Sequence, residues 1–273
     1  IVLALFAALI WYACYRSEGT GELRVSFLDV GQGDAIFIES PNGSQTLIDG
    51  GSGSALLREL SHEMPWYDRS IDLVIGTHPD ADHIGGLVDL LPRYAVAAVV
   101  QSSVLGDTDV WRTFQQEARE EKHAQLITAE RGQVIDIGGD AYIEILFPDR
   151  DVAAIETNTG CVVARLVYGE TAFMLSCDSP KPVENYLVRL DGNRLHSDVL
   201  KAGHHGSKTS SSPLFVGFVD PEYVVYSRGC DNGYGHPHQE TIDTYARFDI
   251  PTIDTCEEGT ITFISDGATV TRK

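Results

Sequence analysis

The sequence is short of positive charge. Only 20 Lys and Arg residues stand against 40 Asp and Glu, so the formal net charge at pH 7 is -20. A protein that binds nucleic acid along an extended surface normally presents a basic footprint to it. The composition therefore argues against a general electrostatic hold on a polyanion. A polyanionic substrate would need local help from metal ions and from a few Lys or Arg side chains beside the site.

Cysteine is also scarce, and no CxxC pair occurs. The five cysteines are Cys14, Cys161, Cys177, Cys230 and Cys256. They are too few for a disulfide scaffold, so we expect most of them to be small buried side chains that say little about the compartment. Internal repeats and low-complexity runs are absent as well. With 273 residues, 43% of them hydrophobic and 22% charged, the chain suits one large domain or two small ones.

Long apolar runs are confined to the first residues. Residues 1–15 are almost purely apolar and favour the end of a transmembrane helix or signal anchor, truncated at its start. A buried N-terminal helix is the alternative. Residues 16–22 then resemble a short linker, and residues 23–273 form the remaining domain. On this basis we expect the chain to be anchored to a membrane through its N-terminal segment.

Residues 77–86 are the most informative stretch, reading Thr-His-Pro-Asp-Ala-Asp-His-Ile-Gly-Gly. A short β-branched run precedes them and a helical pattern follows from residue 84, so they are predicted to form a strand-to-helix turn. Such a turn can direct several side chains to one point. Imidazole and carboxylate groups together suit Zn²⁺, Mn²⁺ or Fe, and carboxylates favour the harder ions. The candidate metal ligands are His78, Asp80, Asp82 and His83. A solvated polar turn is the less economical interpretation of so dense a cluster.

Two further motifs follow apolar strands. Asp178 comes directly after one, where a lone Asp usually caps the next helix but can also bridge two metal ions. Residues 198–208 carry a pair of histidines, His204 and His205, flanked by Lys201 and Lys208. Adjacent side chains point to opposite sides of an extended backbone. We therefore expect one histidine of the pair to face the site and the other to support it.

A third motif, residues 232–238, contains His236 and His238 in a Gly-rich and Pro-containing loop. Such a pair of histidines in a surface loop often consists of ordinary polar side chains without a function. However, six of the nine histidines of the chain lie in the three motifs, and convergence on one site is the economical explanation.

Three other polar residues are candidates for supporting roles. Asp34 and Asp49 follow strand-like segments and can orient the metal turn by hydrogen bonds, although turn stabilisation explains them equally well. Arg228 can hold a phosphate group or be an ordinary solvated side chain.

Alternation and turn signals predict the remaining elements. Helices are expected at 54–64, 84–92, 108–121, 180–190, 212–218 and 239–247. Strands are expected at 23–30, 35–39, 45–48, 71–76, 95–101, 124–128, 141–147, 158–168, 171–177, 197–202, 223–226, near 252 and over 259–272. Two blocks of strands and helices, each ending in ligand-like residues, predict an α/β protein with two sheets packed face to face and helices outside.

In order, the motifs Val-Gly-Gln-Gly-Asp-Ala (30–35), Ile-Asp-Gly-Gly (48–51), the turn at 77–86, Asp178, Leu-Lys-Ala-Gly-His-His-Gly-Ser-Lys (200–208) and Tyr-Gly-His-Pro-His (234–238) resemble the metallo-β-lactamase superfamily. More narrowly, they are similar to the soluble metallo-hydrolase domain of the ComEC/Rec2 DNA-uptake (competence) proteins. The similarity runs from about residue 24 to 264. It implies an αββα four-layer sandwich, preceded here by the truncated hydrophobic helix, with a dinuclear metal site along one edge of the sheets.

The resemblance also implies an activity and a setting. Such a domain is expected to be a nuclease-like phosphodiesterase that degrades the DNA strand not taken up, with single-stranded DNA as its substrate. Its partners would be the membrane and a separate DNA-uptake channel protein, and the catalytic domain would lie on the extracytoplasmic side.

Carried over residue by residue, the resemblance places His78 and Asp80 on one metal and Asp82 and His83 on the other, with Asp178 bridging. One histidine of each later pair would complete the site or act as an acid. The implied metal ligands are His78, Asp80, Asp82, His83, Asp178 and His236. The implied catalytic residues are Asp82, His204, His205, Lys201 and Lys208. The supporting residues are Asp34, Asp49, Asn158, Arg228 and His238.

Two departures from the family pattern concern the first metal. Asp80 stands where the superfamily usually has a histidine, and Asn158 stands where a histidine commonly precedes the bridging Asp. Both changes remove nitrogen ligands, which favours Mn²⁺ over Zn²⁺ for the two divalent ions. Two alternatives remain open on the residues alone: a small-molecule hydrolase acting on a lactone or thioester, and a non-catalytic DNA-binding scaffold with a vestigial site.

Overall fold

The structure is a computed structural model that describes residues 21–121 and 124–273. The apolar segment 1–15 and most of the expected linker therefore lie outside the described residues. None of the helices within the described ranges combines the length and the apolar character that a membrane crossing requires.

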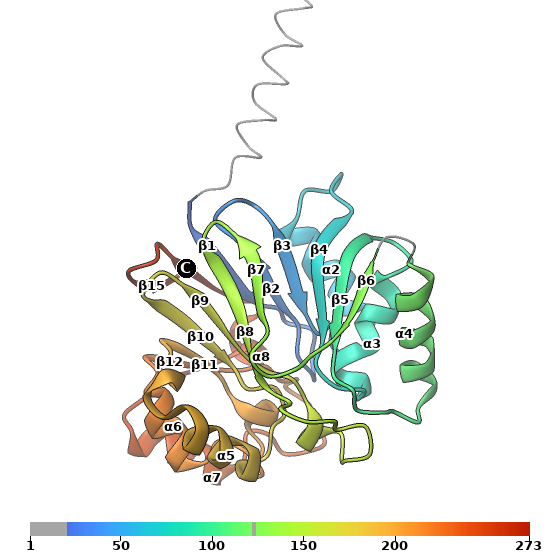
Figure 1. Ribbon diagram of the computed structural model, residues 1–273. Coiled ribbons are helices and arrows are strands. Elements are labelled where there is room, and N and C mark those ends of the chain that lie inside the picture. The colour runs from blue at the N-terminus through green and yellow to red at the C-terminus, as the bar shows by residue number, and fades with distance from the viewer. Residues whose placement is uncertain (1–20, 122–123) are drawn as a thin grey trace, which may run out of the picture.

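Two β-sheets form the body of the domain (Figure 1). The eight-stranded sheet has the order β15-β14-β1-β2-β3-β4-β5-β6, and the seven-stranded sheet has the order β13-β12-β11-β10-β9-β8-β7. Strands β3 to β6 run parallel to one another, as do β10 to β13. The strands are β1 (Leu23–Phe27), β2 (Ile36–Glu39), β3 (Gln45–Ile48), β4 (Ser70–Gly76), β5 (Ala95–Gln101), β6 (Gln125–Thr128), β7 (Val134–Gly138), β8 (Ala141–Phe147), β9 (Val163–Tyr168), β10 (Thr171–Leu175), β11 (Val199–Lys201), β12 (Tyr223–Tyr226), β13 (Thr252–Asp254), β14 (Ile261–Ser265) and β15 (Val270–Arg272).

Helices cover the outer face of each sheet, which gives the expected helix–sheet–sheet–helix layering (Figure 1). Helices α2 to α4 pack on the first sheet, and α5 to α7 pack on the second. The α-helices are α2 (Ala55–Glu63), α3 (Ala81–Leu90), α4 (Asp109–Glu120), α5 (Lys181–Asp191), α6 (Pro213–Val219), α7 (Gln239–Arg247) and α8 (Thr255–Glu258), and the 3-10 helices are η1 (Asn158–Gly160), η2 (Gly192–Leu195) and η3 (Gly203–Gly206).

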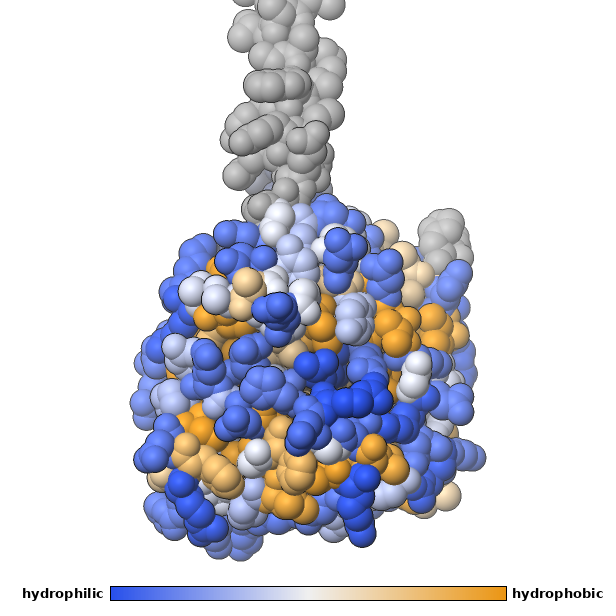
Figure 2. Space-filling model, turned by 60° about the vertical axis from the view of Figure 1, so that its left-hand side comes forward, coloured by the Kyte–Doolittle hydropathy of each residue, from blue (hydrophilic) through white to orange (hydrophobic). Residues whose placement is uncertain are grey.

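The sequence produces these layers because its strands are apolar on both faces. In β2, Ile36 and Ile38 point into the core between the sheets, whereas Phe37 points out under the helices. The sheets meet through the inner core, where the rings of Phe173 and Phe263 are 6.2 Å apart in an edge-to-face arrangement. Burial on both faces drives the sandwich together. The outside of the domain is mostly hydrophilic on the face in Figure 2, where apolar residues form small separate patches.

Some expected boundaries are wrong. Helix α3 begins at Ala81 rather than at residue 84, because Asp80 has an extended backbone and takes the N-cap position. Asp82 and His83 therefore lie in the first turn of a helix. The strand β7 was not expected, because only Ile137 of this edge strand is fully buried and the apolar signal is weak. Strand β1 ends at Phe27, which leaves residues 28–35 as the loop that carries Asp34.

The expectation that the cysteines are simply buried side chains is only half right. Cys161 and Cys177 are buried free thiols. Cys230 and Cys256 form a disulfide, with their Cα atoms 5.0 Å apart. The two residues are 26 positions apart in the sequence, and they meet because Cys230 follows β12 while Cys256 follows the neighbouring strand β13.

Candidate metal centre

The candidate site lies where strands of both sheets end. Asp49 follows β3, the turn at 77–80 follows β4, Asp178 follows β10, and the histidine pair follows β11. In parallel sheets the carboxyl ends of the strands share one edge, which is where α/β proteins commonly build their sites. The loop at 31–34 reaches the same edge because Gly33 has no side chain. A Cβ there would be 2.0 Å from the backbone oxygen of Asp82.

His83 is the most tightly oriented ligand candidate. Its Nδ1 lies 2.7 Å from the Asp49 carboxylate, which also accepts hydrogen bonds from the backbone nitrogen and the hydroxyl of Thr77, at 2.8 Å and 2.6 Å. This contact engages Nδ1, so Nε2, 3.3 Å from Asp178, is the nitrogen through which His83 would bind a metal ion. Asp49 thus contacts the ligand candidate that the sequence expects it to support.

The histidine pair differs from the expectation. His204 and His205 are not extended: both have left-handed backbones, with φ of 49° and 54°, and such a conformation in non-glycine residues often marks a functional site. As a result both rings face Asp178, with Nε2 atoms 3.5 Å and 3.4 Å from its carboxylate. His205 is buried, and its Nδ1 lies 2.9 Å from the backbone oxygen of Ser227. Its Nε2 is also 3.5 Å from Asp82.

Three imidazole nitrogens in the site lack a hydrogen-bond partner among the described residues: the Nε2 atoms of His78, His83 and His205. All three rings are buried, and buried polar atoms are rarely left unpaired. Ligand atoms of Asp82, His83 and His205 lie within 4.8 Å of one another, as do those of Asp34, Asp178 and His205. Unpaired imidazole nitrogens beside carboxylates fit divalent metal ions.

His78 lies beside His83, with their ring centroids 4.1 Å apart. Its Nδ1 is 3.1 Å from the Thr77 hydroxyl and 3.4 Å from Sγ of Cys177, so the Nε2 side faces Asp80 at 3.6 Å. Asp80 is partly exposed, at 39%. Cys177 also has a left-handed backbone, with φ of 51°. The sequence did not suggest that this thiol contacts a ligand candidate, because the contact depends on the packing of β10 against the turn after β4.

Two buried carboxylates of the site, Asp34 and Asp178, are held in the anionic form by neighbouring positive charges. Burial alone would raise the pKa of Asp34, but the charges of Lys201 and His205 outweigh it and lower the pKa to about 2. The pKa of Asp178 lies well below its usual value for the same reason, because His205, His83 and Lys201 outweigh the effect of burial. Negative charge is therefore concentrated where cations would bind.

Two of the cations that were expected to contact phosphate form internal ion pairs in the structure. Lys201 is buried, and its Nζ forms an ion pair with Asp34 and lies 3.3 Å from Asp178, so it faces the floor of the site rather than a phosphate group in solvent. Arg228 binds Asp254, with Nε 2.6 Å from Oδ2 and only 12% of the side chain exposed. Lys208 is exposed at the rim, as phosphate contact requires.

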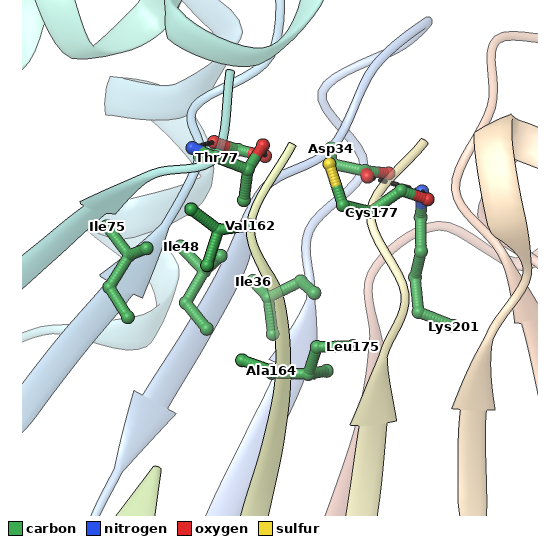
Figure 3. Close-up of a pocket in the computed structure, with 11 residues that line it drawn as sticks. Asp34, Ile36, Ile48, Ile75, Thr77, Val162, Ala164, Leu175, Cys177 and Lys201 are labelled. Atoms are coloured by element: carbon green, nitrogen blue, oxygen red, sulfur yellow. Dashed lines mark hydrogen bonds and ion pairs between the residues drawn. The ribbon is translucent and has the colours of Figure 1, made fainter. Parts of the chain in front are cut away.

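A small cavity lies beneath these polar groups (Figure 3). Its volume is about 10 Å³, which is close to the space that one water molecule needs. Asp34, Thr77, Cys177 and Lys201 lie at its polar end, and apolar side chains such as Ile36 and Leu175 lie below (Figure 3). The site therefore rests directly on the core between the sheets.

The loop at 232–238 contributes a second layer of rings. The centroid of His236 is 5.6 Å from that of His204 and 5.0 Å from that of His238. Burial and the charges of His205 and His204 lower the pKa of His236 to about 4, which keeps the ring neutral. Within the described ranges His236 is not one of the residues whose ligand atoms cluster. The side-chain Oδ1 of Asn158 is buried and has no hydrogen-bond partner among the described residues. Nδ1 of His238 lies 3.2 Å from the backbone nitrogen of Lys208.

The fold and this site define a class of protein. Residues 28–229 match the metallo-beta-lactamase superfamily, and the chain belongs to that superfamily. Among curated proteins it is similar to ComE operon protein 3 of Bacillus subtilis (strain 168), with 31% identity over 93% of this chain and 34% of that protein. Competence protein ComA of Neisseria gonorrhoeae is 30% identical over 93% of the chain and 34% of its own length. Recombination protein 2 of Haemophilus influenzae is 28% identical over 96% and 31%. The chain thus spans about a third of the length of these relatives.

Solved structures share the fold. Igni18, a metallo hydrolase from the archaeon Ignicoccus hospitalis, superposes with a TM-score of 0.59 at 15% identity, covering 89% of this chain and 98% of that one. Zn²⁺-bound PqqB from Methylobacterium extorquens gives 0.53 at 9% identity, covering 85% and 97%. The superfamily and the ligand candidates together support a metal-dependent hydrolase.

Proposed function

We propose that this chain is a phosphodiesterase that cleaves DNA, with a preference for single strands, and that it uses two divalent metal ions, preferably Mn²⁺. The observation that carries this proposal is the set of three buried imidazole Nε2 atoms that have no hydrogen-bond partner among the described residues and that face carboxylates, those of His83 and His205 facing Asp178 and that of His78 facing Asp80. The choice of DNA is supported by the similarity to proteins named for competence and recombination.

In this proposal the ligand candidates fall into two groups. His78 and Asp80, 3.6 Å apart, would hold one ion. Asp82, His83 and His205 would hold the other, and His205 is chosen over His204 because its free Nε2 is buried beside Asp82. Asp178 would contribute its carboxylate beside that second group, since its Oδ2 lies 3.3 Å from Nε2 of His83 and 3.4 Å from Nε2 of His205, and we keep for it the bridging role that the family resemblance implies. His236 and Asn158 would complete the surroundings of the site.

Two bound divalent ions would supply an activated water as the nucleophile and would stabilise charge on the phosphoryl group. The residues of the chain provide the rest. His204 is 26% exposed and its Nε2 faces the site, so it can pass a proton to the leaving oxygen. Lys208 at the rim would neutralise the phosphate, while Asp49 and Asp34 hold His83 and Lys201 in place.

The setting that we propose is DNA uptake at a membrane. Residues 1–15 would anchor the chain, the domain would lie on the extracytoplasmic side, and a DNA-uptake channel protein would be its partner. The Cys230–Cys256 disulfide supports this location, because disulfides persist mainly in oxidising compartments.

A nuclease assay with added metals tests the function. Metal-stripped protein should cleave single-stranded DNA when Mn²⁺ or Zn²⁺ is returned. The double variant Asp82→Ala with His83→Ala should neither bind metal nor cleave DNA, while its circular dichroism spectrum is unchanged. Asp220→Asn is the control, because Asp220 is exposed and caps α6 away from the site. Full cleavage by the double variant would overturn the assignment.

A second candidate is a hydrolase of small molecules such as lactones or thioesters. The net charge of -20 and the engagement of Lys201 and Arg228 in internal ion pairs favour it, because both reduce the attraction for a polyanion. A panel of lactones and thioesters, measured beside DNA with the same metal, distinguishes the two. Hydrolysis of a lactone or thioester of the panel without cleavage of DNA would establish the second candidate.

A further inference from the structure

Tyr234 is an exposed aromatic residue at the rim of the candidate metal centre. Its ring stacks on His236, with centroids 5.6 Å apart and an interplanar angle of 22°. His236 in turn contacts His204, whose Nε2 faces Asp178. Tyr234 remains 66% exposed, so one face of its ring is covered by His236 and the other is open to solvent.

Single exposed apolar residues are common on protein surfaces and need no explanation by themselves. Tyr234 differs because the loop around it is fixed. The side chain of Asn232 donates to the backbone oxygens of Gly229 and His236 and accepts from the backbone nitrogen of His236. At the start of the loop, the Cys230–Cys256 disulfide ties the chain to α8. A ring held in this way loses little conformational freedom when a second ring stacks on it.

The charge of the chain adds a second argument. Proteins that bind single-stranded nucleic acid combine a positive groove with aromatic rings on which the bases stack. Lys201 and Arg228 do not contribute to such a groove at this site, because Asp34 and Asp254 hold them in internal ion pairs. Lys208, in contrast to Lys201 and Arg228, is an exposed cation at this rim. Binding to bases by stacking requires no positive charge.

We propose that the open face of Tyr234 stacks on the nucleobase next to the scissile phosphate. The inference rests on the proposed phosphodiesterase function and names its substrate as a nucleotide diester with an unstacked base. In a duplex both faces of a base are covered by its neighbours, so this contact would favour single strands. Every base has an aromatic face, so no sequence preference is expected.

Two diesters with the same leaving group test the proposal. Thymidine 5′-(p-nitrophenyl phosphate) carries a base, whereas methyl p-nitrophenyl phosphate carries none, and both release p-nitrophenolate. In the full chain with Mn²⁺, Tyr234→Ala should lower kcat/KM for the thymidine ester by about tenfold or more, mainly through KM. Its kcat/KM for the methyl ester should not change. Tyr234→Phe keeps the ring and should behave like the parent on both.

Tyr67→Ala is the matched control. Tyr67 is 70% exposed, and it precedes the amino end of β4, at the opposite edge of the sheet from the site. This variant should change neither rate. Equal losses on both esters for Tyr234→Ala, or no loss on either, would overturn the role of Tyr234.

A binding measurement separates this inference from the proposed function. Titration of a short oligothymidylate by calorimetry requires no turnover. If the parent cleaves neither ester but binds the oligonucleotide about tenfold more tightly than Tyr234→Ala does, the phosphodiesterase function fails and the stacking contact stands. If the two proteins bind it equally, the stacking contact fails as well.

Discussion

The Asp49 carboxylate lies 2.7 Å from Nδ1 of His83, and the same carboxylate accepts two hydrogen bonds from Thr77. Asp49 follows β3, and Thr77 follows the adjacent parallel strand β4. A single buried side chain therefore joins two strand ends and sets the orientation of a ligand candidate. Groups that orient a metal-binding histidine in this way fix its tautomer and raise its basicity.

Replacing Asp49 should weaken metal binding without unfolding the protein. Asp49→Asn retains the size of the side chain but removes the charge that holds the proton on Nδ1 of His83. We expect metal affinity to fall by about 10- to 100-fold, measured by calorimetric titration of the metal-free protein. Asp220→Asn should bind metal as the parent does. Unchanged affinity in Asp49→Asn would show that the carboxylate only stabilises the turn.

The burial of Lys201 between Asp34 and Asp178 predicts a large effect on stability. Lys201→Ala removes the ammonium group that pairs with two buried carboxylates, and breaking a buried ion pair in this way costs about 3–5 kcal/mol. Urea unfolding of the metal-free protein measures it. Lys208→Ala, at an exposed position, should change stability by about 0.5 kcal/mol or less. If Lys201→Ala is as stable as the parent and loses only turnover, Lys201 contacts phosphate after all.

The choice of ion should respond to residue 80. Asp80 faces His78 at 3.6 Å and supplies oxygen where a histidine would supply nitrogen. We expect higher activity and occupancy with Mn²⁺ than with Zn²⁺, and Asp80→His should shift both toward Zn²⁺. Elemental analysis after equilibration with equal concentrations of the two ions gives the occupancy independently of rates. A parent protein that prefers Zn²⁺ in that competition would remove the argument.

A buried carboxyl group outside the site predicts a pH effect on stability. Glu184 in α5 accepts hydrogen bonds from the backbone nitrogens of Ser211 and Ser212, both at 2.7 Å, yet burial raises its pKa from 4.5 to about 7. Between these values the native state keeps a proton that the unfolded state loses, so this group makes the protein less stable as pH rises through that window.

The variant Glu184→Gln isolates that effect. The difference in unfolding free energy between the variant and the parent should shift in favour of the variant by about 3 kcal/mol from pH 4.5 to pH 8, which is the free energy that such a change in pKa represents. Urea unfolding at several pH values measures the difference. A difference that does not vary with pH would mean that the two backbone donors keep Glu184 ionised throughout.

The local features of this protein follow from short stretches of sequence. The turn at 77–86 places His78 and His83 after a β-branched strand, and the two-faced apolar pattern of segments such as Ile36–Glu39 requires cover on both sides. Both depend on residues a few positions apart, and the spacing of side chains along a strand or helix is set by backbone geometry. For this reason the layered fold and the strand-to-helix turn at 77–86 could be predicted.

Only the tertiary structure decided which distant residues meet. The order of strands brings Cys230 to Cys256, buries Lys201 between two carboxylates, and turns both His204 and His205 toward Asp178 through a left-handed backbone. None of these contacts can be predicted from the spacing of residues along the chain, because each depends on which loops lie side by side at the sheet edge. Burial then determines the chemistry, since the same lysine would be a mobile cation in water and is a fixed counter-charge in the interior.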